Sequence, residues 1–321
     1  MPNVTIALKL LQRIDRMVHS DQGSAYRGWL KQVLPHIGDA YRQDEDGHRT
    51  HMGASILGHE CAREIWYNFH WATKSNFPGR IVRLFNRGHI EEGRLIALLL
   101  MAGVHVYQQD ENGNQFRISF ADGHAGGSGD GQALHIPDLP PDTMALCEFK
   151  THGEKSFIEL AGPLDEWRSY LAGESTYFAG KGVREAKFEH YVQMQLYMHK
   201  MGIAAALYVA VNKNTDDLYA EIVTLDTAMA EQFIQRGEKL VWMVLPPDKI
   251  NKSPGFFKCR FCDHRPVCHL KAAPDRNCRT CQHSQPVAGG QWECTLLKQI
   301  LPKELQLTGC DRYDMGRIYG V

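Results

Sequence analysis

The sequence contains no long hydrophobic run and no recognisable export signal. No stretch of about 18 uncharged apolar residues, the length that a membrane-spanning helix needs, occurs in the 321 residues. Charged side chains interrupt the apolar ones from the first turns onward, unlike the apolar segment of a secretory signal. These absences predict a soluble, cytoplasmic protein that makes no contact with a membrane.

The sequence also lacks an excess of one charge, internal repeats and low-complexity tracts. The 36 lysines and arginines nearly cancel the 37 aspartates and glutamates, which leaves a formal net charge of −1. The molecule as a whole would not attract a polyanion, so any nucleic-acid site must be local. The hydrophobic share of 43% is enough for a substantial core, in one large domain or two smaller ones.

Nine cysteines are present, and they are unevenly placed. Cys61 and Cys147 are isolated, whereas the last quarter of the chain contains Cys259, Cys262, Cys268, Cys278, Cys281, Cys294 and Cys310. Disulfide frameworks are typical of small secreted chains, and this chain is neither small nor marked for export. The clustered cysteines therefore predict metal ligation. Cys147 is left without partners, and we expect it to be a small buried strand residue.

Hydrophobic periodicity separates helical from strand-forming parts. Apolar residues at helical spacing predict helices at 5–18, 26–37, 59–72, 87–103, 187–202 and about 226–244, with a polar loop at 42–51. Alternating patterns predict three hairpins, at 104–109 with 115–120, at 131–136 with 144–150, and at 204–213 with 217–225. This order predicts an α/β fold in which helices flank one mixed central sheet.

Charged residues interrupt the apolar pattern of the second hairpin. Glu148 and Lys150 are two residues apart, so they share one face of the predicted strand. Asp130 lies in a glycine-rich turn before the partner strand, where it can approach Glu148. Two carboxylates there suit Mg²⁺ or Mn²⁺, and Lys150 could polarise water or stabilise charge on a phosphate. The alternative is a solvent-facing Glu–Lys pair.

Two predicted helices carry further polar residues that suit such a site. His89 and Glu92 are three residues apart and share a face, so His89 could add an imidazole ligand while Glu92 orients its neighbours. Gln193 and Tyr197 are four residues apart on a helix that is otherwise apolar at core spacing. The alternatives are that His89 is an ordinary surface histidine and that Tyr197 is an ordinary core tyrosine.

These motifs follow one another along the chain as Gly88-His89, the Gly-x-x-Asp that ends at Asp130, Glu148-x-Lys150, and Gln193-x3-Tyr197. Their order resembles the RecB-type nucleases of the PD-(D/E)xK superfamily, over roughly residues 55–270. The resemblance implies a restriction-endonuclease-like fold. It implies metal ligands at His89, Asp130 and Glu148. It also implies that Lys150 is the catalytic lysine and that Gln193 and Tyr197 support the site and the DNA strand.

The C-x2-C-x5-C motif of Cys259, Cys262 and Cys268, with Cys61 about 200 residues earlier, resembles the iron–sulfur branch of these nucleases. That branch includes the CRISPR adaptation nucleases and the AddB nuclease domain. The resemblance implies a [4Fe-4S] cluster on the four cysteines that joins the two ends of the domain. Zn²⁺ is the alternative, because four thiolates suit either group.

The last cysteines predict a small zinc-binding appendage. This segment is too short to form a stable hydrophobic core without a cross-link or a bound metal. Its candidate ligands are Cys278, Cys281, Cys294 and Cys310, and His283 could replace one thiolate. The chain then divides into an N-terminal helical region at 1–50, a nuclease domain at 51–270 and the zinc-binding appendage at 271–321.

Basic and aromatic residues are interleaved between the strand of Glu148 and the helix of Gln193. They are Lys155, Phe157, Trp167, Tyr170, Lys181, Arg184 and Lys187. Such a mixture suits a DNA single strand, and the alternative is an ordinary solvated helical insertion.

Two classes of function fit the sequence. The first is a metal-dependent deoxyribonuclease, an exonuclease on single-stranded DNA or duplex ends in recombination, repair or replication, with partners among recombination or replication proteins. The second is a non-catalytic nucleic-acid-binding or scaffold protein that keeps the fold. The presence of Asp130, Glu148 and Lys150 together favours the enzyme, because a binding protein does not need all three.

Overall fold

The computed structural model describes residues 4–41, 43, 48–316 and 319. The chain forms two compact units, each built from three separate segments. Unit 1 comprises Met1–Asp44, Phe77–Arg117 and Ser128–Ala230, and unit 2 comprises Glu45–Asn76, Ile118–Gly127 and Glu231–Val321. The domain boundaries predicted at residues 50 and 270 do not coincide with the boundaries of these two units, and the three-part division stays a prediction. Residues 42 and 44–47 of the predicted polar loop lie outside the described residues.

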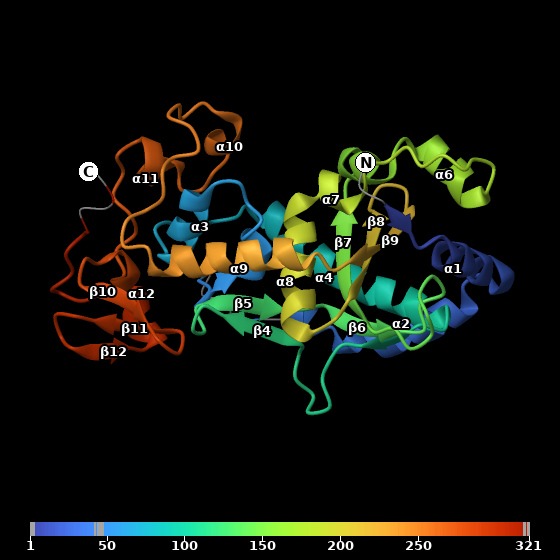
Figure 1. Cartoon of the computed structure of the whole chain (residues 1–321), viewed down its shortest axis with the longest axis horizontal. Coiled ribbons are helices and arrows are strands. Elements are labelled where there is room, and N and C mark those ends of the chain that lie inside the picture. The colour runs from blue at the N-terminus through green and yellow to red at the C-terminus, as the bar shows by residue number, and fades with distance from the viewer. Residues whose placement is uncertain (1–3, 42, 44–47, 317–318, 320–321) are drawn as a thin grey trace. The chain divides into compact units, whose positions relative to one another are not determined.

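Unit 1 contains a six-stranded mixed sheet with the strand order β1-β9-β8-β7-β6-β3 (Figure 1). Its strands are β1 (Thr5–Ile6), β3 (His105–Tyr107), β6 (Gly131–Leu134), β7 (Ala145–His152), β8 (Ala205–Asn212) and β9 (Leu218–Thr224). β7 and β8 are parallel, and the other neighbours are antiparallel. All eight residues of β8 are buried, as expected of a strand that is covered on both faces.

Helices flank this sheet. They are α1 (Leu8–Asp21), α2 (Ser24–Val33), α4 (Gly79–Met101), α5 (Glu154–Ala161), α6 (Leu164–Ala172), α7 (Gly182–Ala186) and α8 (Phe188–Met201), with 3-10 turns at Leu34–His36 and Gly38–Tyr41. Both α4 and α8 contact β7, so they bring side chains to the strand that carries Glu148 (Figure 1). The predicted α/β fold with a mixed central sheet and flanking helices is confirmed.

Two of the three predicted hairpins are confirmed. β6 pairs with β7 through Gly131 opposite Cys147, and β8 pairs with β9. The hairpin predicted at 104–109 and 115–120 is wrong, because β3 pairs with the edge of β6 while β4 (Arg117–Phe120) joins another sheet. Within the described ranges, pairing between the two predicted strands is limited to a bridge between Gln109 and Gln115.

Unit 2 is built around helices and two small sheets. Its sheets have the orders β2-β5-β4 and β10-β11-β12. Its strands are β2 (Met52–Gly53), β4, β5 (Ala125–Ser128), β10 (Ser284–Val287), β11 (Gln291–Cys294) and β12 (Gln299–Leu301). Its helices are α3 (Ala62–Phe69), α9 (Thr227–Trp242), α10 (Phe257–Arg260), α11 (Arg265–His269) and α12 (Lys303–Thr308), with 3-10 turns at Ala54–Ile56 and Cys278–Thr280. Three of these elements, β4, β5 and α9, begin or end in unit 1. The predicted helix near 226–244 is confirmed as α9.

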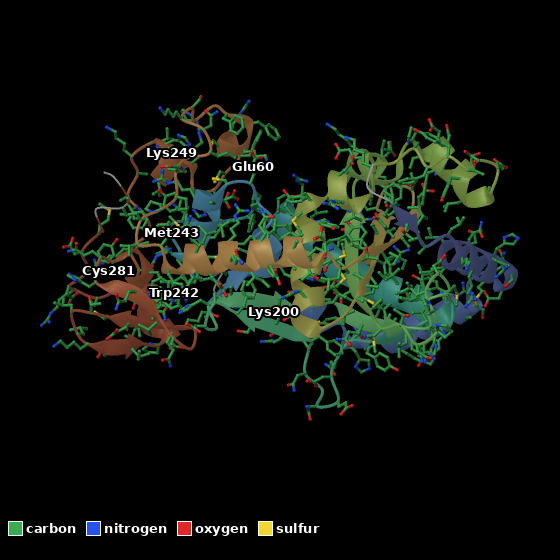
Figure 2. The ribbon with its side chains drawn as sticks, in the orientation of Figure 1. Glu60, Lys200, Trp242, Met243, Lys249 and Cys281 are labelled. Atoms are coloured by element: carbon green, nitrogen blue, oxygen red, sulfur yellow. The ribbon has the colours of Figure 1, made fainter. Side chains whose placement is uncertain are left out.

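The core of unit 2 joins residues that are far apart in the sequence. Trp66 and Tyr67 of α3 pack with Val267 and Tyr319. The Trp66 indole also donates a 2.9 Å hydrogen bond to the carbonyl of Met243, which Figure 2 labels. This core places the segment that begins at Cys61 beside the late segment of the same unit.

A buried arginine occupies an aromatic cage in unit 2. Arg279 is 2% exposed, and its guanidinium carbon lies 3.9 Å from the ring centroid of Trp71 and 4.7 Å from that of Trp292. Its nitrogens donate to the side-chain oxygen of Gln306 at 2.8 Å and to the carbonyls of Phe69 at 2.9 Å and Thr50 at 2.8 Å. Burial lowers the pKa of Arg279 to about 9, which leaves the guanidinium charged at neutral pH.

Among the helices that the structure describes, none is both long and apolar enough to cross a membrane.

Candidate active site

The alternation of β7 places Glu148 and Lys150 on one face of the sheet. Glu148 is fully buried, and the Lys150 ammonium forms an ion pair with its Oε1. Gln193 of α8 donates a hydrogen bond from Nε2 to Oε2 of the same carboxylate at 3.1 Å. Both oxygens of Glu148 are therefore held by side chains, and the alternative of a solvent-facing pair is wrong.

Asp130 reaches the same strand from the turn before β6. Its Oδ2 accepts a 2.8 Å hydrogen bond from the backbone N–H of Phe149, the residue after Glu148. The turn requires Gly131, which has φ +153° and whose added Cβ would lie 2.7 Å from the carbonyl oxygen of Tyr107. The glycine-rich turn thus lets Asp130 approach β7 as the sequence predicts.

Glu92 adds a third carboxyl group. Burial and then the carboxylates of Asp130, Asp39 and Glu148 together raise the pKa of Glu92 to about 8, against the opposing effect of Lys150. Burial also raises the pKa of Glu148 to about 7, which Lys150 opposes and Asp130 reinforces. Several acids held close together, with Lys150 as the cation among them, would be stabilised by a bound cation.

The same acidic residues also shift the pKa of Lys150. Burial by itself would lower the pKa of Lys150, but the carboxylates of Glu148 and Asp130 raise the pKa above its ordinary value. Lys150 is therefore a protonated ammonium at neutral pH, held against Glu148.

An open pocket gives access to two of these residues, Asp130 and Glu92. It has a volume of about 240 Å³ and lies entirely within unit 1. Its polar lining includes Asp39, Glu92, Gln108, Gln109, Gln115 and Asp130. A polar ligand can therefore reach Asp130 and Glu92 from solvent.

The other two predicted site residues are placed differently. Tyr197 of α8 is buried, and its hydroxyl donates a 2.9 Å hydrogen bond to the carbonyl of Ser128, two residues before Asp130. His89 is half-buried on α4, one turn before Glu92, and makes no hydrogen bond or ion pair to any described residue. Tyr197 thus fixes the segment that carries Asp130, while a ligand role for His89 stays a prediction.

The donor set agrees in chemistry, but not in arrangement, with a bound metal. Asp130, Glu148 and Glu92 offer the oxygen ligands that Mg²⁺ and Mn²⁺ prefer. Within residues 4–41, 43, 48–316 and 319, no three His, Cys, Asp or Glu side chains are arranged to hold a metal ion. Because Lys150 and Gln193 hold the oxygens of Glu148, a metal would have to displace one of these contacts.

Two histidines that the sequence analysis did not identify lie near Lys150. The Tyr208 hydroxyl lies 2.9 Å from Nε2 of His152 and 3.0 Å from Nδ1 of His190. Burial lowers the pKa of His152 to about 4 and that of His190 to about 2, and Lys150 and Lys187 contribute to both shifts. The signal was present in the sequence, because His152 shares the face of β7 with Glu148 and Lys150.

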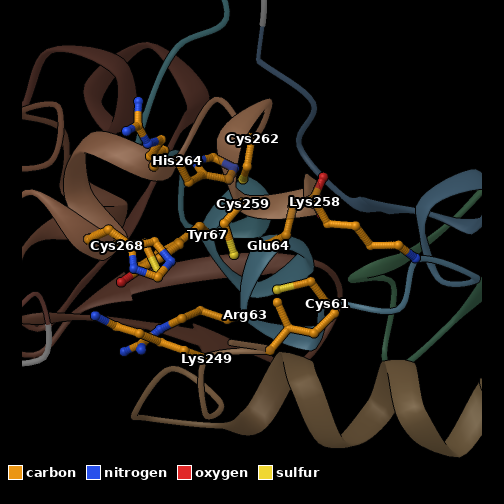
Figure 3. Close-up of a pocket in the computed structure, with 13 residues that line it drawn as sticks. Cys61, Arg63, Glu64, Tyr67, Lys249, Lys258, Cys259, Cys262, His264 and Cys268 are labelled. Carbon is orange, nitrogen blue, oxygen red and sulfur yellow. The ribbon is translucent and has the colours of Figure 1, made fainter. Parts of the chain in front are cut away.

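In unit 2, the four cysteines predicted to hold a cluster line one pocket. Figure 3 shows Cys61 of the early segment beside Cys259, with Cys262 and Cys268 around the same space. Burial is the main cause that raises the pKa of Cys262 to about 12, and the neighbouring Cys61 and Cys268 thiols contribute to this shift. Burial raises the pKa of the Cys268 thiol, and Arg63 and Lys249, which line the same pocket, oppose this shift only in part. Cys147, by contrast, is fully buried in β7, as expected.

The second predicted cysteine set also lies around one pocket. Cys278, Cys281, Cys294 and Cys310, with His283, line a pocket of about 120 Å³. Burial is the main cause that raises the pKa of Cys278 to about 11, and the other three thiols of the set contribute to this shift. The four thiols thus line one pocket, but no three described side chains there are arranged to hold a metal ion, and the zinc-binding role stays a prediction.

The predicted DNA-contacting region needs a correction. Phe157 is fully buried and Trp167 is 1% exposed, so neither ring can stack on a base. Both face inward because α5 and α6 are amphipathic helices that pack into unit 1, where the Trp167 indole donates to the carbonyl of Leu218 at 3.1 Å. Lys187 lies against Glu159 at 3.3 Å.

Comparisons with known proteins give only weak likenesses. No family model matches the sequence, and no curated protein matches it. The crystal structure of LHK-Exo in complex with dAMP is 14% identical, with a TM-score of 0.37 over 67% of this chain and 90% of that chain. The structure of SSO0001 is 14% identical, with a TM-score of 0.37 over 78% of this chain and 100% of that chain. The alkaline exonuclease LHK-Exo from Laribacter hongkongensis is 15% identical, with a TM-score of 0.34 over 67% of this chain and 90% of that chain. Likenesses this weak carry no argument about activity.

Proposed function

We propose that the protein is a divalent-metal-dependent DNA nuclease, acting as an exonuclease on single-stranded DNA or duplex ends in recombination, repair or replication. The observation that supports this proposal most is the buried Glu148, paired with Lys150, bonded to Gln193 and close to Asp130. A purely structural ion pair would not need the added carboxyl groups of Asp130 and Glu92 around it. Proteins of recombination or replication are the partners that fit such a role.

The residues of the site would have different roles in phosphodiester hydrolysis. Asp130 and Glu148, with His89 or Glu92, would hold Mg²⁺ or Mn²⁺, and such an ion would supply charge stabilisation at the phosphate and a more acidic bound water. The Lys150 ammonium would stabilise the negative charge that develops on the phosphate oxygens. Gln193 and Tyr197 would act by position, one by holding the Glu148 carboxylate and the other by holding the segment before Asp130.

The test is cleavage of end-labelled single-stranded and duplex DNA with Mg²⁺ or Mn²⁺. We expect Glu148→Gln and Asp130→Ala to reduce cleavage to background while the proteins remain folded. Lys150→Met should reduce the rate by about 10² to 10³. Asp142→Ala, which removes an exposed carboxylate from the loop between β6 and β7, is the matched control and should keep the wild-type rate. Wild-type cleavage by Glu148→Gln, or no cleavage by the wild type, would contradict the proposal.

The cysteine pocket of unit 2 supports a second part of the proposal. Cys61, Cys259, Cys262 and Cys268 would hold a [4Fe-4S] cluster, and the positive charges of Arg63 and Lys249 suit its thiolate ligands. Protein purified without oxygen should then contain about four iron atoms per chain. Zinc alone in such a preparation would contradict the cluster.

The remaining cysteines would hold Zn²⁺. Four thiolates are the usual ligands of a structural zinc, and unit 2 would gain folding free energy from the ion. We expect Cys278→Ser or Cys281→Ser to remove zinc and to leave the iron content unchanged. Metal analysis of the purified variants separates the two sites.

A further inference from the structure

No side of the first three turns of α4 is buried. All residues from 79 to 90 are exposed or half-buried, although they form a continuous helix. The exposed side chains include large apolar ones, at Phe77 just before the helix and at Val82, Leu84, Phe85 and Ile90. Exposed apolar groups gathered in this number usually mark a binding surface.

The aromatic rings of Phe77 and Phe85 form a pair that is partly exposed to solvent. The ring centroids of Phe77 and Phe85 lie 5.0 Å apart with an interplanar angle of 86°. The two rings are 46% and 48% exposed, respectively. An edge-to-face pair leaves the face of one ring open, and an open aromatic face is what a nucleic-acid base stacks on.

The same stretch is basic. Residues 77–90 contain Arg80, Arg83 and Arg87 and no aspartate or glutamate. The three arginines are spaced by three and four residues, so they form one stripe along α4. Arg80 and Arg83 form no ion pair with any residue that the structure describes, which leaves their charges available to a phosphate backbone.

The helix leads to the candidate active site. Phe85, His89 and Glu92 are spaced by four and three residues, so they lie on one face of α4. Glu92, at the inner end of this face, lines the same pocket as Asp130. A strand that stacks on Phe85 would therefore be led along α4 toward the carboxylates.

We infer that residues 77–90 form a binding surface for single-stranded DNA that leads the strand to Glu92 and Asp130. The inference rests on the proposed function and names the part of the chain that holds its substrate. A lipid surface fits less well, because a helix that lies on a membrane keeps its apolar residues on one face. Here Val82 and Leu84, two residues apart, lie on different sides of α4.

Binding of a labelled single-stranded oligonucleotide in EDTA tests the inference without cleavage. We expect Phe85→Ala to weaken binding by about fivefold to a hundredfold, the effect of losing one stacked base. Arg83→Ala should lower the slope of log affinity against log salt by about 0.7, the value for one phosphate contact on a single strand. Trp29→Ala and Lys31→Ala, which remove an exposed aromatic and an exposed basic side chain from α2, should bind as the wild type does.

The outcomes separate this surface from the nuclease proposal. Wild-type cleavage with unchanged binding by Phe85→Ala and Arg83→Ala would overturn the surface and leave the nuclease standing. Binding that both substitutions weaken, in a protein that cleaves no DNA, would support the surface and contradict the nuclease. If Phe85→Ala instead abolishes binding to vesicles of anionic lipid and leaves oligonucleotide binding unchanged, the inference is wrong.

Discussion

Replacing Arg279 should destabilise unit 2 more than any exposed substitution. In Arg279→Met, the carbonyl of Phe69 and the side chain of Gln306 would each lose a donor in a buried place, and the carbonyl of Thr50 would lose one in a partly buried place. A buried acceptor left without a donor costs about 1–3 kcal/mol, and the contacts with Trp71 and Trp292 contribute about 2 kcal/mol. Because the charged guanidinium itself is costly to bury, we expect the net loss of unfolding free energy to be about 3–5 kcal/mol.

A second substitution separates the charge from the shape of the side chain. Arg279→Lys keeps a cation in the cage, but one ammonium cannot reproduce three donors in a planar fork. We expect it to lose about 1–3 kcal/mol. The control is Arg260→Met, since Arg260 is exposed and lies 5.4 Å from the ring of Phe261, where such contacts contribute at most about 1 kcal/mol.

Urea unfolding followed by tryptophan fluorescence is the assay, because Trp71 and Trp292 form the cage. With a slope of about 3 kcal/mol per molar urea, Arg279→Met should unfold at a urea concentration about 1 M or more below the wild type. Unfolding of Arg279→Met at the wild-type concentration would refute the reasoning. So would an equal loss in Arg260→Met, because the burial of the guanidinium would then not matter.

Three further predictions concern unit 2. Cys61→Ser should lower the iron content and the melting temperature of anaerobically purified protein, and an unchanged iron content would exclude Cys61 as a ligand. Chelation of zinc should destabilise the wild type but not Cys278→Ser, because that variant has already lost the ion; equal melting shifts in both would contradict this. Burial lowers the pKa of His70 from its ordinary 6.5 to about 3, so the unfolded state binds the extra proton and the free energy of unfolding should fall as the pH drops from 6.5 toward 3. His70→Phe, which keeps the stacking on Trp66, should lose less stability over this range, and an equal loss would refute the assignment.

Local patterns predicted much of unit 1. The alternation of β7 places Glu148 and Lys150 on one face, and the glycine turn of Gly131 brings Asp130 to the same strand, because both depend on nearby residues. The raised pKa of Glu92 could not be predicted in this way. This shift depends on how α4 packs against β7, which no short stretch of sequence encodes.

Tertiary packing also explains the predictions that failed. Phe157 and Trp167 lie among basic residues in the sequence, yet the short helices that carry them turn these rings inward. Arg279 is the opposite case. Arginine is almost never fully buried, so nothing in its local sequence predicts that Trp71, more than 200 residues earlier, will cover it.

The three-segment construction of unit 2 has a consequence for its synthesis. A ribosome adds about 5–20 residues per second, so roughly 10–40 s separate the emergence of Cys61 from that of Cys259. During this interval Trp66 and Tyr67 lack the late residues that cover them in the finished core. The growing chain therefore exposes an aromatic surface that chaperones can bind, and the cysteine pocket cannot receive any metal until its last segment has left the ribosome.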